Sequence, residues 1–465
     1  MSETASMPAT LPLCGHTRWD SVIAWTGAGQ CKTMQDWWLD VQALAQQLPP
    51  DCRYVLNVCH DRYQFLVAFA AGVWRNAVSL QPSSLAPSAL EQVIDDAAHT
   101  VCVHDGHSES LDDMAQLVSS MLDIRQRPAL QQPLPLALPD IPTDRVVAKL
   151  YTSGSTGVPV GHIKTWGGIN LDAKTAAMLH GFDQAPACMV GTVPSQHMYG
   201  FESVMMVALL AGCSVWAGRP FFPADMVDAL NSVPVPRVLV TSPAHLRVLV
   251  QAQGEYAPVV RVLCATAPLS LELAQAAEQR FAAPLVEVYG STENNQLALR
   301  RTVEDARWRL FPNVTLEQEG DLVYAFGGHV QIRMPIADLV EMHDAEHFTL
   351  LGRKADVINI AGRRTSLAYL NHQLARVAGV EDGAFFLPKL TQGQEAERLC
   401  LLVCAPGMTA AQVLEGLRPH MDSVFLPRPL ILLPSLPRNE TGKLPQQTLQ
   451  NLYDSYIASH QGGTA

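Results

Sequence analysis

The stretch Leu150-Tyr-Thr-Ser-Gly-Ser-Thr-Gly-Val-Pro159 decides how the rest of the chain is interpreted. An apolar run at 146–151 leads into it and predicts a strand. Residues 152–157 are all Thr, Ser or Gly, so this segment is too polar to pack in a core and too rich in Gly to form a helix. Its backbone N–H groups and hydroxyls can instead surround an anion, and a phosphate cradle is the obvious use. A flexible turn is the alternative, because no Gly-Lys-Ser/Thr follows as in a Walker A loop.

The composition is that of an acidic, folded protein with more than one domain. The chain has 465 residues, of which 48% are hydrophobic and 16% charged, and this length predicts about two to three domains. Its net charge of −12 argues against broad nucleic-acid binding, which requires basic patches. No apolar run approaches the roughly 18 residues of a membrane span, and residues 1–15 lack the basic and apolar segments of a signal peptide. We therefore expect a cytoplasmic protein that has no membrane span and binds no nucleic acid.

The cysteines point to the same compartment. The chain has ten Cys and no CxxC pair, and Cys400 and Cys404 lie in an apolar run typical of a strand. We therefore predict free, buried thiols, as in a reducing cytoplasm.

Apolar runs and helical patterns alternate over residues 33–289. We expect strands at 54–58, 77–80, 100–103, 188–193, 213–216, 238–243, 260–264 and 285–289. We expect helices at 33–48, 61–74, 90–98, 170–179, 201–210, 226–230 and 271–281, an irregular segment at 1–30 and a Pro-rich connector at 128–142. Such alternation predicts a parallel sheet with helices on both faces. Several of the strands end in short polar turns, and ligands bind at that edge of open α/β sheets.

The pattern changes after about residue 310. Segments 323–334 and 348–351 are typical of antiparallel strands, and a compact unit follows Asp356. There we expect a hairpin ending at 364, helices at 369–377 and 410–417, strands at 384–387 and 398–403, and a Pro-rich ending. We place a domain boundary at 353–356. The predicted fold class is α/β: a large N-terminal domain of parallel or mixed sheets with flanking helices plus a β-subdomain, and a small α+β C-terminal domain.

Four separated motifs match one known pattern in order and spacing. They are Tyr151-Thr-Ser-Gly-Ser-Thr-Gly157, Tyr289-Gly-Ser-Thr-Glu293, Asp338 with Gly352-Arg353, and Pro437-Arg-Asn-Glu-Thr-Gly-Lys443. Together they resemble the adenylate-forming superfamily of acyl-CoA synthetases, peptide-synthetase adenylation domains and luciferases, over nearly the whole chain. The resemblance implies that a carboxylate attacks the α-phosphate of MgATP to give acyl-AMP and pyrophosphate, and that a thiol then takes the acyl group. It also implies an AMP-binding domain at 1–352 with the acyl and ATP sites, a hinge at 353–356 and a mobile domain at 357–465.

The resemblance assigns the nucleotide site, and with it the cofactors ATP and Mg²⁺. The β- and γ-phosphates would be held by Thr152, Ser153, Gly154, Ser155, Thr156 and Gly157. Thr292 would contact the α-phosphate, and Glu293 would ligate Mg²⁺, a hard cation that prefers oxygen ligands. Tyr289, followed by Gly290, would stack on adenine. The residues opposite it would be Ala267 and Pro268. The structural alternatives are a surface carboxylate for Glu293 and a core tyrosine for Tyr289.

Further residues complete the reaction that the resemblance implies. Asp338 would accept hydrogen bonds from the ribose, which Arg353 would also meet; a turn cap is the alternative for Asp338. Lys443 would bridge the acyl carboxylate and the α-phosphate, a task suited to a compact ammonium. Gly362 would lie in the loop that approaches the pantetheine, and Arg364 would face the active site or the thiol channel. The catalytic residues implied are Lys443, Thr292, Glu293 and Arg353.

Residues 194–206 resemble the acyl pocket of plant coumarate ligases. Tyr199 stands where amino-acid-activating members have an aspartate, and without that carboxylate the ammonium of an α-amino acid would be buried unpaired. Hydroxyls in this region are able to bind a phenolic hydroxyl, although ordinary buried polar groups are the alternative. The pocket residues assigned are His197, Tyr199, Gly200, Ser203, Thr241 and Ser242. The expected substrate is a small aryl acid such as a hydroxybenzoate or hydroxycinnamate, and a short- or medium-chain aliphatic acid is the alternative.

The acceptor thiol stays open. The chain resembles stand-alone ligases of aryl-polyene pathways, which load a hydroxybenzoyl group onto an acyl carrier protein. Coenzyme A carries the same pantetheine thiol, and either acceptor would use basic residues on this acidic chain. The candidates for that basic rim are Arg363, Arg428 and Arg438.

The sequence also departs from the family pattern. Val160 stands where a Lys usually follows the phosphate loop, with Lys164 as a partial substitute, and Ala355 replaces a polar hinge residue. Pro445 and Gln446 follow Lys443 where a basic residue is common. These departures keep a second hypothesis open, a scaffold that binds nucleotide or acyl ligand without turnover.

Overall fold

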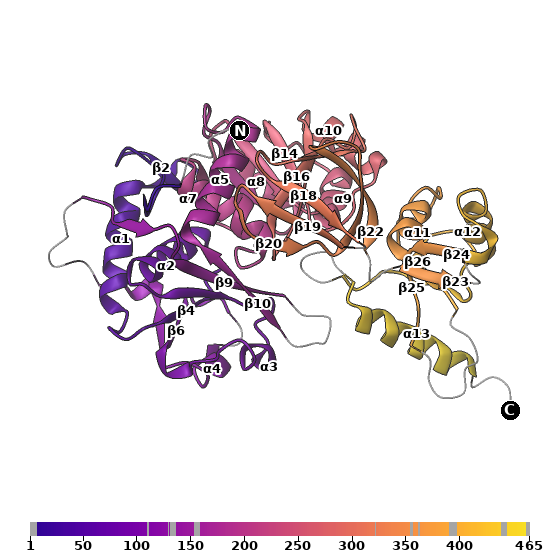
Figure 1. Ribbon diagram of the computed structural model, residues 1–465, viewed down its shortest axis with the longest axis horizontal. Helices are drawn as coiled ribbons and strands as arrows, with labels where there is room; N and C mark the ends of the chain where they lie inside the picture. The colour runs from indigo at the N-terminus through magenta and orange to yellow at the C-terminus, as the bar shows by residue number, and fades with distance from the viewer. Residues whose placement is uncertain are drawn as a thin grey trace.

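The computed structural model describes two bodies of unequal size. It covers residues 7–108, 111–128, 130, 136–152, 159–320, 322–353, 357–360, 363–389, 398–438 and 444–461. The larger body ends with strand β22 (His347–Arg353), and the smaller body is built from residues beyond it (Figure 1). This is the predicted α/β architecture, with a large N-terminal part and a small C-terminal part.

A six-stranded sheet forms one layer of the larger body. Its order is β10 (Val160–Thr165), β9 (Val146–Thr152), β5 (Val78–Gln81), β4 (Tyr54–Asn57), β6 (Thr100–His104) and β7 (Ser120–Asp123). All neighbours are parallel except β9 and β10, which form an antiparallel pair. The strands other than β7 and β10 are almost fully buried, which explains why the sequence shows apolar runs instead of alternation.

An eleven-stranded sheet forms the second layer. Its order is β21 (Asp338–Met342), β22, β17 (Trp308–Leu310), β16 (Asn295–Arg300), β15 (Leu285–Ser291), β14 (Arg261–Cys264), β13 (Arg237–Thr241), β11 (Cys188–Gly191), β12 (Ser214–Trp216), β2 (Val22–Gly27) and β3 (Gln30–Thr33). The run from β15 to β2 is parallel, so the carboxyl ends of these strands share one edge. The strands from β15 to β21 pair antiparallel.

Helices separate and cover these sheets. The interior layer contains α1 (Met34–Gln47), α2 (Arg62–Trp74), α5 (Trp166–His180), α6 (Met198–Gly200), the π-helix η3 (Phe201–Met206) and α7 (Val207–Leu210). Helix α2 contacts β4 and β5 of the smaller sheet and β12 of the larger one. The outer face of the larger sheet is covered by α8 (Pro223–Ser232), α9 (Pro243–Gln251) and α10 (Leu271–Phe281). Short helices α3 (Pro87–Leu90) and α4 (Leu111–Met114) cover the smaller sheet on its other side.

Local sequence explains where the long helices begin and end. Thr33 caps α1 with a capping box to Asp36, and the Asp61 carboxylate accepts a hydrogen bond from the first turn of α2. Helix α5 ends at Gly181, whose φ of 76° is the left-handed conformation that glycine adopts without strain. None of the helices in the described ranges is long and apolar enough to cross a membrane.

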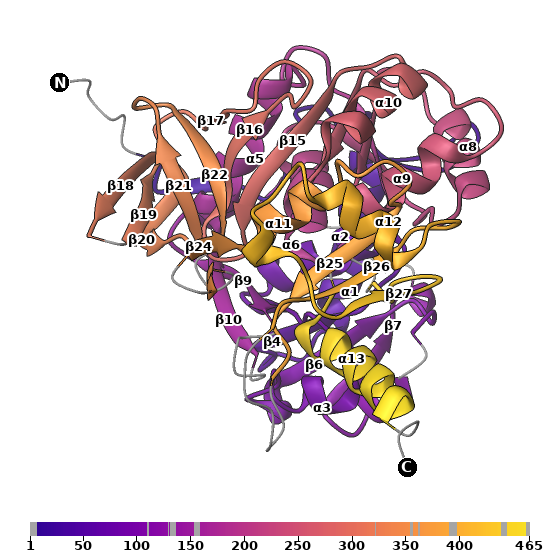
Figure 2. The ribbon, with the colours of Figure 1, turned by 90° about the vertical axis from the view of Figure 1, so that its right-hand side faces the viewer.

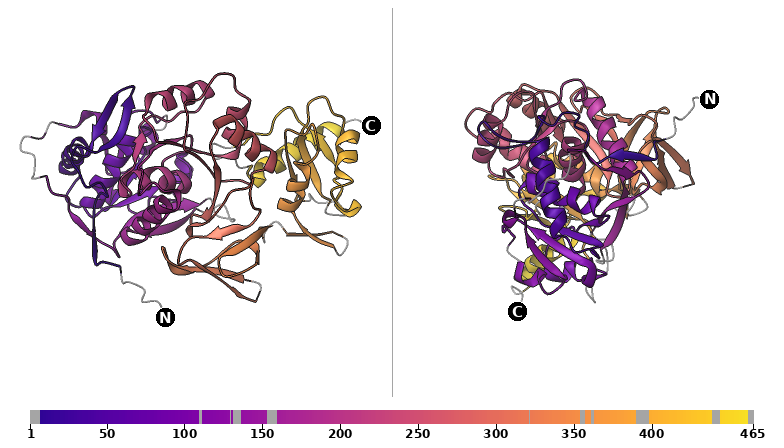
Figure 3. Two further views of the ribbon diagram at one scale, coloured as in Figure 1. Left: turned by 90° about the horizontal axis from the view of Figure 1, so that it is seen from above. Right: turned by 90° about the vertical axis from the view of Figure 1, so that its left-hand side faces the viewer.

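A third, smaller sheet flanks the larger body. It contains β18 (Thr315–Glu319), β19 (Leu322–Gly327) and β20 (Val330–Pro335), all antiparallel. Seen from above, these orange strands form a separate layer beside the main body (Figure 3, left). They match the antiparallel β-subdomain expected after residue 310.

The C-terminal body is a sheet with helices on both faces. It contains the hairpin β23 (Val357–Ile360) and β24 (Arg363–Ser366), the sheet β25 (Asp382–Phe386), β26 (Cys400–Cys404) and β27 (Leu430–Leu432), and helices α11 (Leu367–Leu374), α12 (Ala410–Leu417) and α13 (Gln446–Gln461). Side chains alternate across the sheet: Phe385 packs with α11 and α12, whereas Phe386 packs with Tyr453 of α13. Figure 2 shows α13 below β25, β26 and β27. Helix α11 and strand β24 contact β22, so this body adjoins the predicted hinge.

Several sequence expectations were wrong in detail. Residues 1–30 are not irregular throughout, since β1 (Thr10–Pro12) and β2 lie there, and β1 pairs with β8 (Asp140–Pro142) inside the Pro-rich connector. No continuous helix spans the described residues 90–98. The short helix α3 ends at Leu90, turns follow it, and a 3₁₀ turn lies at 97–99, because local Asp and Pro residues favour turns. The pattern also missed β10, β16, α9 and α13. All ten cysteines are free, as predicted, but Cys31 is exposed.

Candidate active site

The predicted phosphate loop connects a β-hairpin. Thr152 at the end of β9 pairs with Val160 at the start of β10. Residues Ser153, Gly154, Ser155, Thr156 and Gly157 lie outside the described residues. The Thr152 hydroxyl is 3.2 Å from Nε2 of His162, two positions along β10 from Val160. Val160 itself is half exposed, at 48%. The hairpin therefore fixes both ends of the loop at the edge of the smaller sheet.

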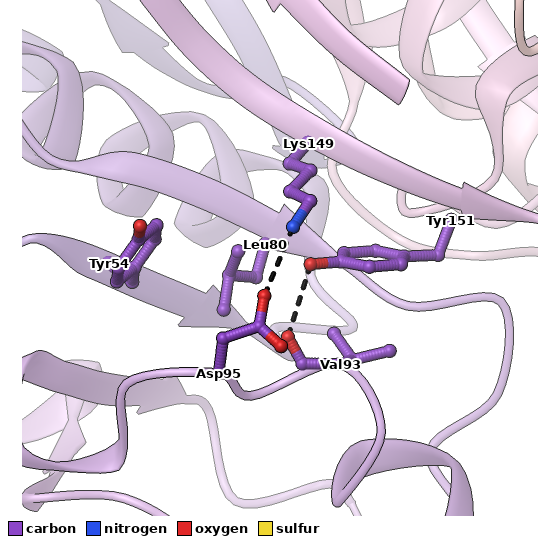
Figure 4. A pocket seen from close by; sticks show the side chains of 6 residues that line it. All are labelled: Tyr54, Leu80, Val93, Asp95, Lys149 and Tyr151. Atoms are coloured by element: carbon purple, nitrogen blue, oxygen red, sulfur yellow. Dashed lines mark hydrogen bonds and ion pairs between the residues drawn. The ribbon is translucent and has the colours of Figure 1, made fainter. Parts of the chain in front are cut away.

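Side chains on β9 divide between the two faces of this sheet. Tyr151 points away from Thr152, and its hydroxyl donates to the carbonyl oxygen of Val93 at 3.1 Å (Figure 4). Lys149 lies on the same face as Tyr151 and donates to Asp95 at 3.2 Å (Figure 4). Because successive side chains of a strand alternate, the first residue of the motif anchors the hairpin while Thr152 faces the site.

The second motif meets the first around His162. The Glu293 carboxylate lies 3.6 Å from His162 Nε2, so Thr152 and Glu293 both border one imidazole. Burial lowers the pKa of His162 below its usual value, which favours the neutral ring at neutral pH. The Glu293 side chain is 35% exposed. A neutral neighbour and access to solvent leave this carboxylate able to bind a cation.

The turn between β15 and β16 carries Thr292 and Glu293. A bulge falls between Tyr289 and Gly290, and a Cβ on Gly290 would overlap the carbonyl oxygen of Asn295. Asn295 itself has φ of 63°, a left-handed conformation. The glycine of the motif is therefore required by a close backbone approach.

Tyr289 links the second motif to the third. Its hydroxyl donates to the Asp338 carboxylate at 2.8 Å, and its ring lies against Trp308 and Phe348 at 5.5 Å and 5.7 Å between centroids. Asp338 stands directly opposite Arg353 in the β21–β22 pair. The structure thus brings the Tyr289 and Asp338 side chains together and places the Arg353 backbone beside Asp338. For Arg353 and Arg364 the structure describes the backbone alone, on β22 and β24.

The predicted adenine-facing turn follows β14. Ala267 and Pro268 are half-buried and exposed, respectively, beyond the last residue of that strand. Thr266 has φ of 83°, which is strained for a β-branched residue. Strain of this kind concentrates at ligand sites, and the turn lies on the edge where the parallel strands end.

The predicted acyl pocket surrounds α6 and η3. Tyr199 and Ser203 are 6% and 2% exposed, and neither hydroxyl has a hydrogen-bond partner among the described residues. Burial raises the pKa of Tyr199, so its phenol stays neutral. Gly200 allows close packing, because a Cβ there would overlap the carbonyl oxygen of Pro194. His197 is the N-cap residue of α6 and is half-buried.

Two other predicted pocket hydroxyls are already engaged. The Thr241 hydroxyl is 3.0 Å from that of Thr192. The Ser242 hydroxyl caps α9 and lies 3.1 Å from Nδ1 of His245. The structure therefore separates the four candidates, leaving Tyr199 and Ser203 as the available pair.

A buried charged cluster went unrecognised in the sequence. Lys164, the expected partial substitute for the missing loop lysine, donates to the Thr292 carbonyl oxygen at 2.6 Å and to the Asn295 side chain. Glu202 and Asp172 lie nearby, and burial raises the pKa of both carboxyls. His162 and Lys164 alternate along the strand that follows the loop, and this alternation was the sequence signal that one face of the strand carries functional side chains.

Lys443 and Gly362, the residues predicted for adenylation and for thiol access, lie outside the described residues. In the described part of the chain, no three His, Cys, Asp or Glu side chains group as metal ligands. A Mg²⁺ site of one carboxylate and substrate phosphates does not need such a group.

The chain is similar to known proteins in sequence and in fold. A 4-coumarate–CoA ligase of Rhodobacter capsulatus is 26% identical over 235 residues, which make up 50% of this chain and 59% of that ligase. In fold, the ATP-bound crystal structure of MatB from Rhodopseudomonas palustris gives a TM-score of 0.80 at 19% identity, covering 94% of this chain and 96% of that one. The o-succinylbenzoate-CoA synthetase MenE of Bacillus subtilis, in complex with its acyl-adenylate intermediate, gives 0.79 at 15% identity, covering 93% and 95%.

These similarities confirm the predicted superfamily and fold class. Residues 22–317 match the family model described as AMP-binding enzyme, and this stretch contains the phosphate loop, the acyl segment and the Glu293 turn. The expectation of an AMP-binding enzyme of the ligase type is confirmed with them. The chain belongs to the AMP-binding enzyme family.

Proposed function

We propose that this chain activates a carboxylic acid with ATP and then transfers the acyl group to a pantetheine thiol. In the first step the acid's carboxylate attacks the α-phosphate, the bond to the β-phosphate oxygen breaks, and pyrophosphate leaves. In the second step a thiol attacks the acyl carbon and releases AMP. The observation that carries the proposal is that separate motifs meet at both ends of the segment 289–293: Glu293 lies with Thr152 beside His162, and Tyr289 bonds Asp338.

Nucleotide binding would use two groups of contacts. Asp338, oriented by the Tyr289 hydroxyl, accepts hydrogen bonds from the ribose, and Tyr289 borders the adenine. Thr152 and its loop donate to the terminal phosphates, and Thr292 contacts the α-phosphate. Two anions meet in this reaction, so fixed donors must face the charge that develops.

The residues present fit a magnesium ion. Glu293 offers a partly exposed carboxylate beside the neutral His162, and hard oxygen donors of this kind suit Mg²⁺. The ion, when bound with ATP, neutralises phosphate charge. Lys443 supplies a further cation on the C-terminal side, where an ammonium between the carboxylate and the α-phosphate reduces their repulsion.

The acid is proposed to be a small aryl acid with a hydroxyl group. Tyr199 and Ser203 are buried on consecutive turns of one helical segment, without partners among the described residues. A buried hydroxyl without a partner is costly, and a substrate hydroxyl would supply one. The 4-coumarate–CoA ligase to which the chain is similar acts, by its name, on a hydroxylated aryl acid. A short- or medium-chain aliphatic acid is the alternative substrate.

The acceptor is proposed to be the pantetheine of an acyl carrier protein or of coenzyme A. The domains proposed are 1–352 and 357–465, with a hinge at 353–356, because β22 ends at Arg353 beside β24 and α11. After adenylation the small domain would rotate, withdrawing Lys443 and bringing Gly362 and Arg364 to the thiol channel. A cytoplasmic location is proposed on the free state of all ten cysteines.

The test is acid-dependent exchange of labelled pyrophosphate into ATP. A panel of hydroxybenzoates, hydroxycinnamates, unsubstituted aryl acids and fatty acids is offered with MgATP. Exchange with hydroxylated aryl acids above all others is expected. Preference for fatty acids would replace the substrate proposal with the aliphatic alternative. No exchange with any acid, in a chain that still binds ATP, would contradict the enzymatic proposal and favour a scaffold.

A further inference from the structure

Lys164 is a buried cation whose hydrogen bonds are directed to one turn. It lies on β10 and is 5% exposed. Burying an ammonium is costly unless it is hydrogen-bonded and paired. Among the described residues, its hydrogen bonds go to the carbonyl oxygen of Thr292, at 2.6 Å, and to the side-chain oxygen of Asn295. These two acceptors lie on either side of Glu293.

That turn needs restraint from outside. Gly290 has no room for a Cβ, Asn295 is in the left-handed region, and the ladder between β15 and β16 shifts register after Tyr289. Backbone in sparsely populated conformations persists only where surrounding groups hold it. Within the turn, the Asn294 N–H donates to the backbone and the side chain of Ser291 at 3.3 Å each, and bonds of this length are weak.

A buried set of acids interacts electrostatically with Lys164. Glu202 on η3 and Asp172 on α5 are 4% and 1% exposed, and His329 lies 3.4 Å from Asp172. Gln296 of β16 donates to Asp172 at 3.3 Å. Electrostatic attraction to Lys164 opposes the burial that raises the pKa of both carboxyls. The cluster thus connects β10, the interior helices and β16.

We propose that Lys164 is a positioning residue that fixes the turn carrying Thr292 and Glu293 against the edge of the smaller sheet. The turn and the phosphate loop belong to different sheets, and Lys164 on β10 bridges the gap between them. Its ammonium holds the Thr292 carbonyl on one side of Glu293 and the Asn295 side chain on the other, so the carboxylate stays beside His162 and Thr152. The inference rests on the proposed function, because it gives Glu293 its role with MgATP.

The alternative is that Lys164 serves only as a counter-ion for Glu202 and Asp172. The two roles differ in what a substitution changes. Loss of a counter-ion lowers stability, whereas loss of the hydrogen bonds to Thr292 and Asn295 also moves Glu293. A readout specific to the metal therefore separates them.

The experiment measures ATP binding with Mg²⁺ and with EDTA, by calorimetry, for Lys164→Met. Methionine keeps the unbranched length and removes the charge and donors. We expect ATP affinity in EDTA to stay within about twofold and the enhancement by Mg²⁺ to fall about tenfold, because a displaced ligand costs binding geometry. In pyrophosphate exchange, kcat should fall about 10–100-fold, because a small misplacement of a group at the reaction centre lowers the rate by about this factor.

The matched control is Lys149→Met on the neighbouring strand. Lys149 binds Asp95 on the opposite face of β9, away from the site. This variant should keep the enhancement by Mg²⁺ and the exchange rate within about twofold of the original chain. A loss equal to that of Lys164→Met would show a general effect of removing a lysine from this hairpin and would overturn the inference.

The double variant Lys164→Met with Glu202→Gln isolates the counter-ion role. It removes a buried carboxyl together with its cation, so folding stability should recover relative to Lys164→Met. The enhancement of ATP binding by Mg²⁺ should stay low, because the bonds to the turn are still missing. Full recovery of the enhancement would mean that Lys164 acts through charge balance alone, and would overturn the inference.

The binding measurement does not depend on turnover. If the original chain binds MgATP but exchanges no pyrophosphate, the proposed function fails while the binding comparison still decides the role of Lys164. If the original chain binds ATP equally with Mg²⁺ and with EDTA, Glu293 holds no metal and the inference is overturned.

Discussion

The Tyr289 hydroxyl donates a hydrogen bond to the Asp338 carboxylate at 2.8 Å, joining β15 to β21. The two residues belong to different sequence motifs and are separated by β16 to β20. Their bond orients the carboxylate that is proposed to receive the ribose. It also helps to fix the Tyr289 ring, which packs against Trp308 and Phe348.

Tyr289→Phe should weaken ATP binding without abolishing catalysis. The phenylalanine keeps the ring but leaves the Asp338 carboxylate without this donor, at a cost of about 1–2 kcal/mol. We expect the KM for ATP in pyrophosphate exchange to rise about tenfold, while kcat changes little. Tyr256→Phe is the control. The Tyr256 hydroxyl also donates a hydrogen bond, at 3.1 Å, but its acceptor is the carbonyl oxygen of Leu249 on α9. Equal effects of the two variants would contradict a role for the Tyr289 hydroxyl at the nucleotide.

Gly290→Ala should disrupt the turn that carries Glu293. The added Cβ would overlap the Asn295 carbonyl oxygen, so the bulge must open. We expect adenylation to fall by about two orders of magnitude, since the turn positions groups at the phosphates. Gly181→Ala is the control: it strains a left-handed glycine at the end of α5 but meets no atom within 4 Å. Urea denaturation should show destabilisation for both variants, about 1 kcal/mol for the control, but only Gly290→Ala should lose exchange activity.

Tyr199→Phe and Ser203→Ala should change the preference for the acid. Each removes a buried hydroxyl that has no partner among the described residues. We expect kcat/KM for a hydroxybenzoate to fall about tenfold and that for benzoate to stay unchanged or rise, because only the former has a hydroxyl to bind. Exchange assays with the paired acids measure this difference. A parallel loss for both acids would mean that these hydroxyls serve packing instead of recognition.

Lys443→Ala should separate the two half-reactions. The lysine is proposed to contact the converging anions only during adenylation. We expect acyl-AMP formation to fall by about two to three orders of magnitude, while thioester formation from supplied acyl-AMP is retained. Gly362→Leu should show the reverse, since a larger side chain would block the pantetheine. Equal loss of both half-reactions in Lys443→Ala would contradict its assigned role.

His180→Leu should make the protein less sensitive to acid. Burial lowers the pKa of His180 from 6.5 to about 3, and neither ring nitrogen has a partner among the described residues. As pH falls below 6.5 the unfolded state takes up a proton that the folded state refuses, so stability decreases. The His180→Leu variant lacks this group. Its gain in free energy of unfolding over the original chain should therefore be about 2 kcal/mol larger at pH 5 than at pH 7.5. Urea denaturation at the two pH values checks it; an unchanged difference would mean that the imidazole is protonated in the fold.

The local sequence is sufficient for most of the larger body. Apolar runs identify β4, β6, β9, β11, β13, β14 and β15 because strands buried on both faces need continuous hydrophobic side chains. Helices α1, α2 and α10 follow from periodicity and caps at Thr33, Asp61 and Ser270. Strand β10 was missed because it is a mostly polar edge strand, with Val160 and Ile163 exposed and Lys164 buried. Helix α13 was missed because its pattern begins beyond a Pro-rich segment.

The candidate site, too, is determined partly by the sequence and partly by the tertiary structure. The identity of the motifs, and hence the family, is determined by the sequence, because residues such as Glu293 and Asp338 keep a fixed order and spacing along the chain. Which side chains meet is decided by tertiary structure, since hydrogen bonds between strands distant in sequence depend on sheet order and register. Only the fold shows that Tyr289 bonds Asp338, that Ser242 is used as a helix cap, and that Lys164 is directed to the turn of the second motif.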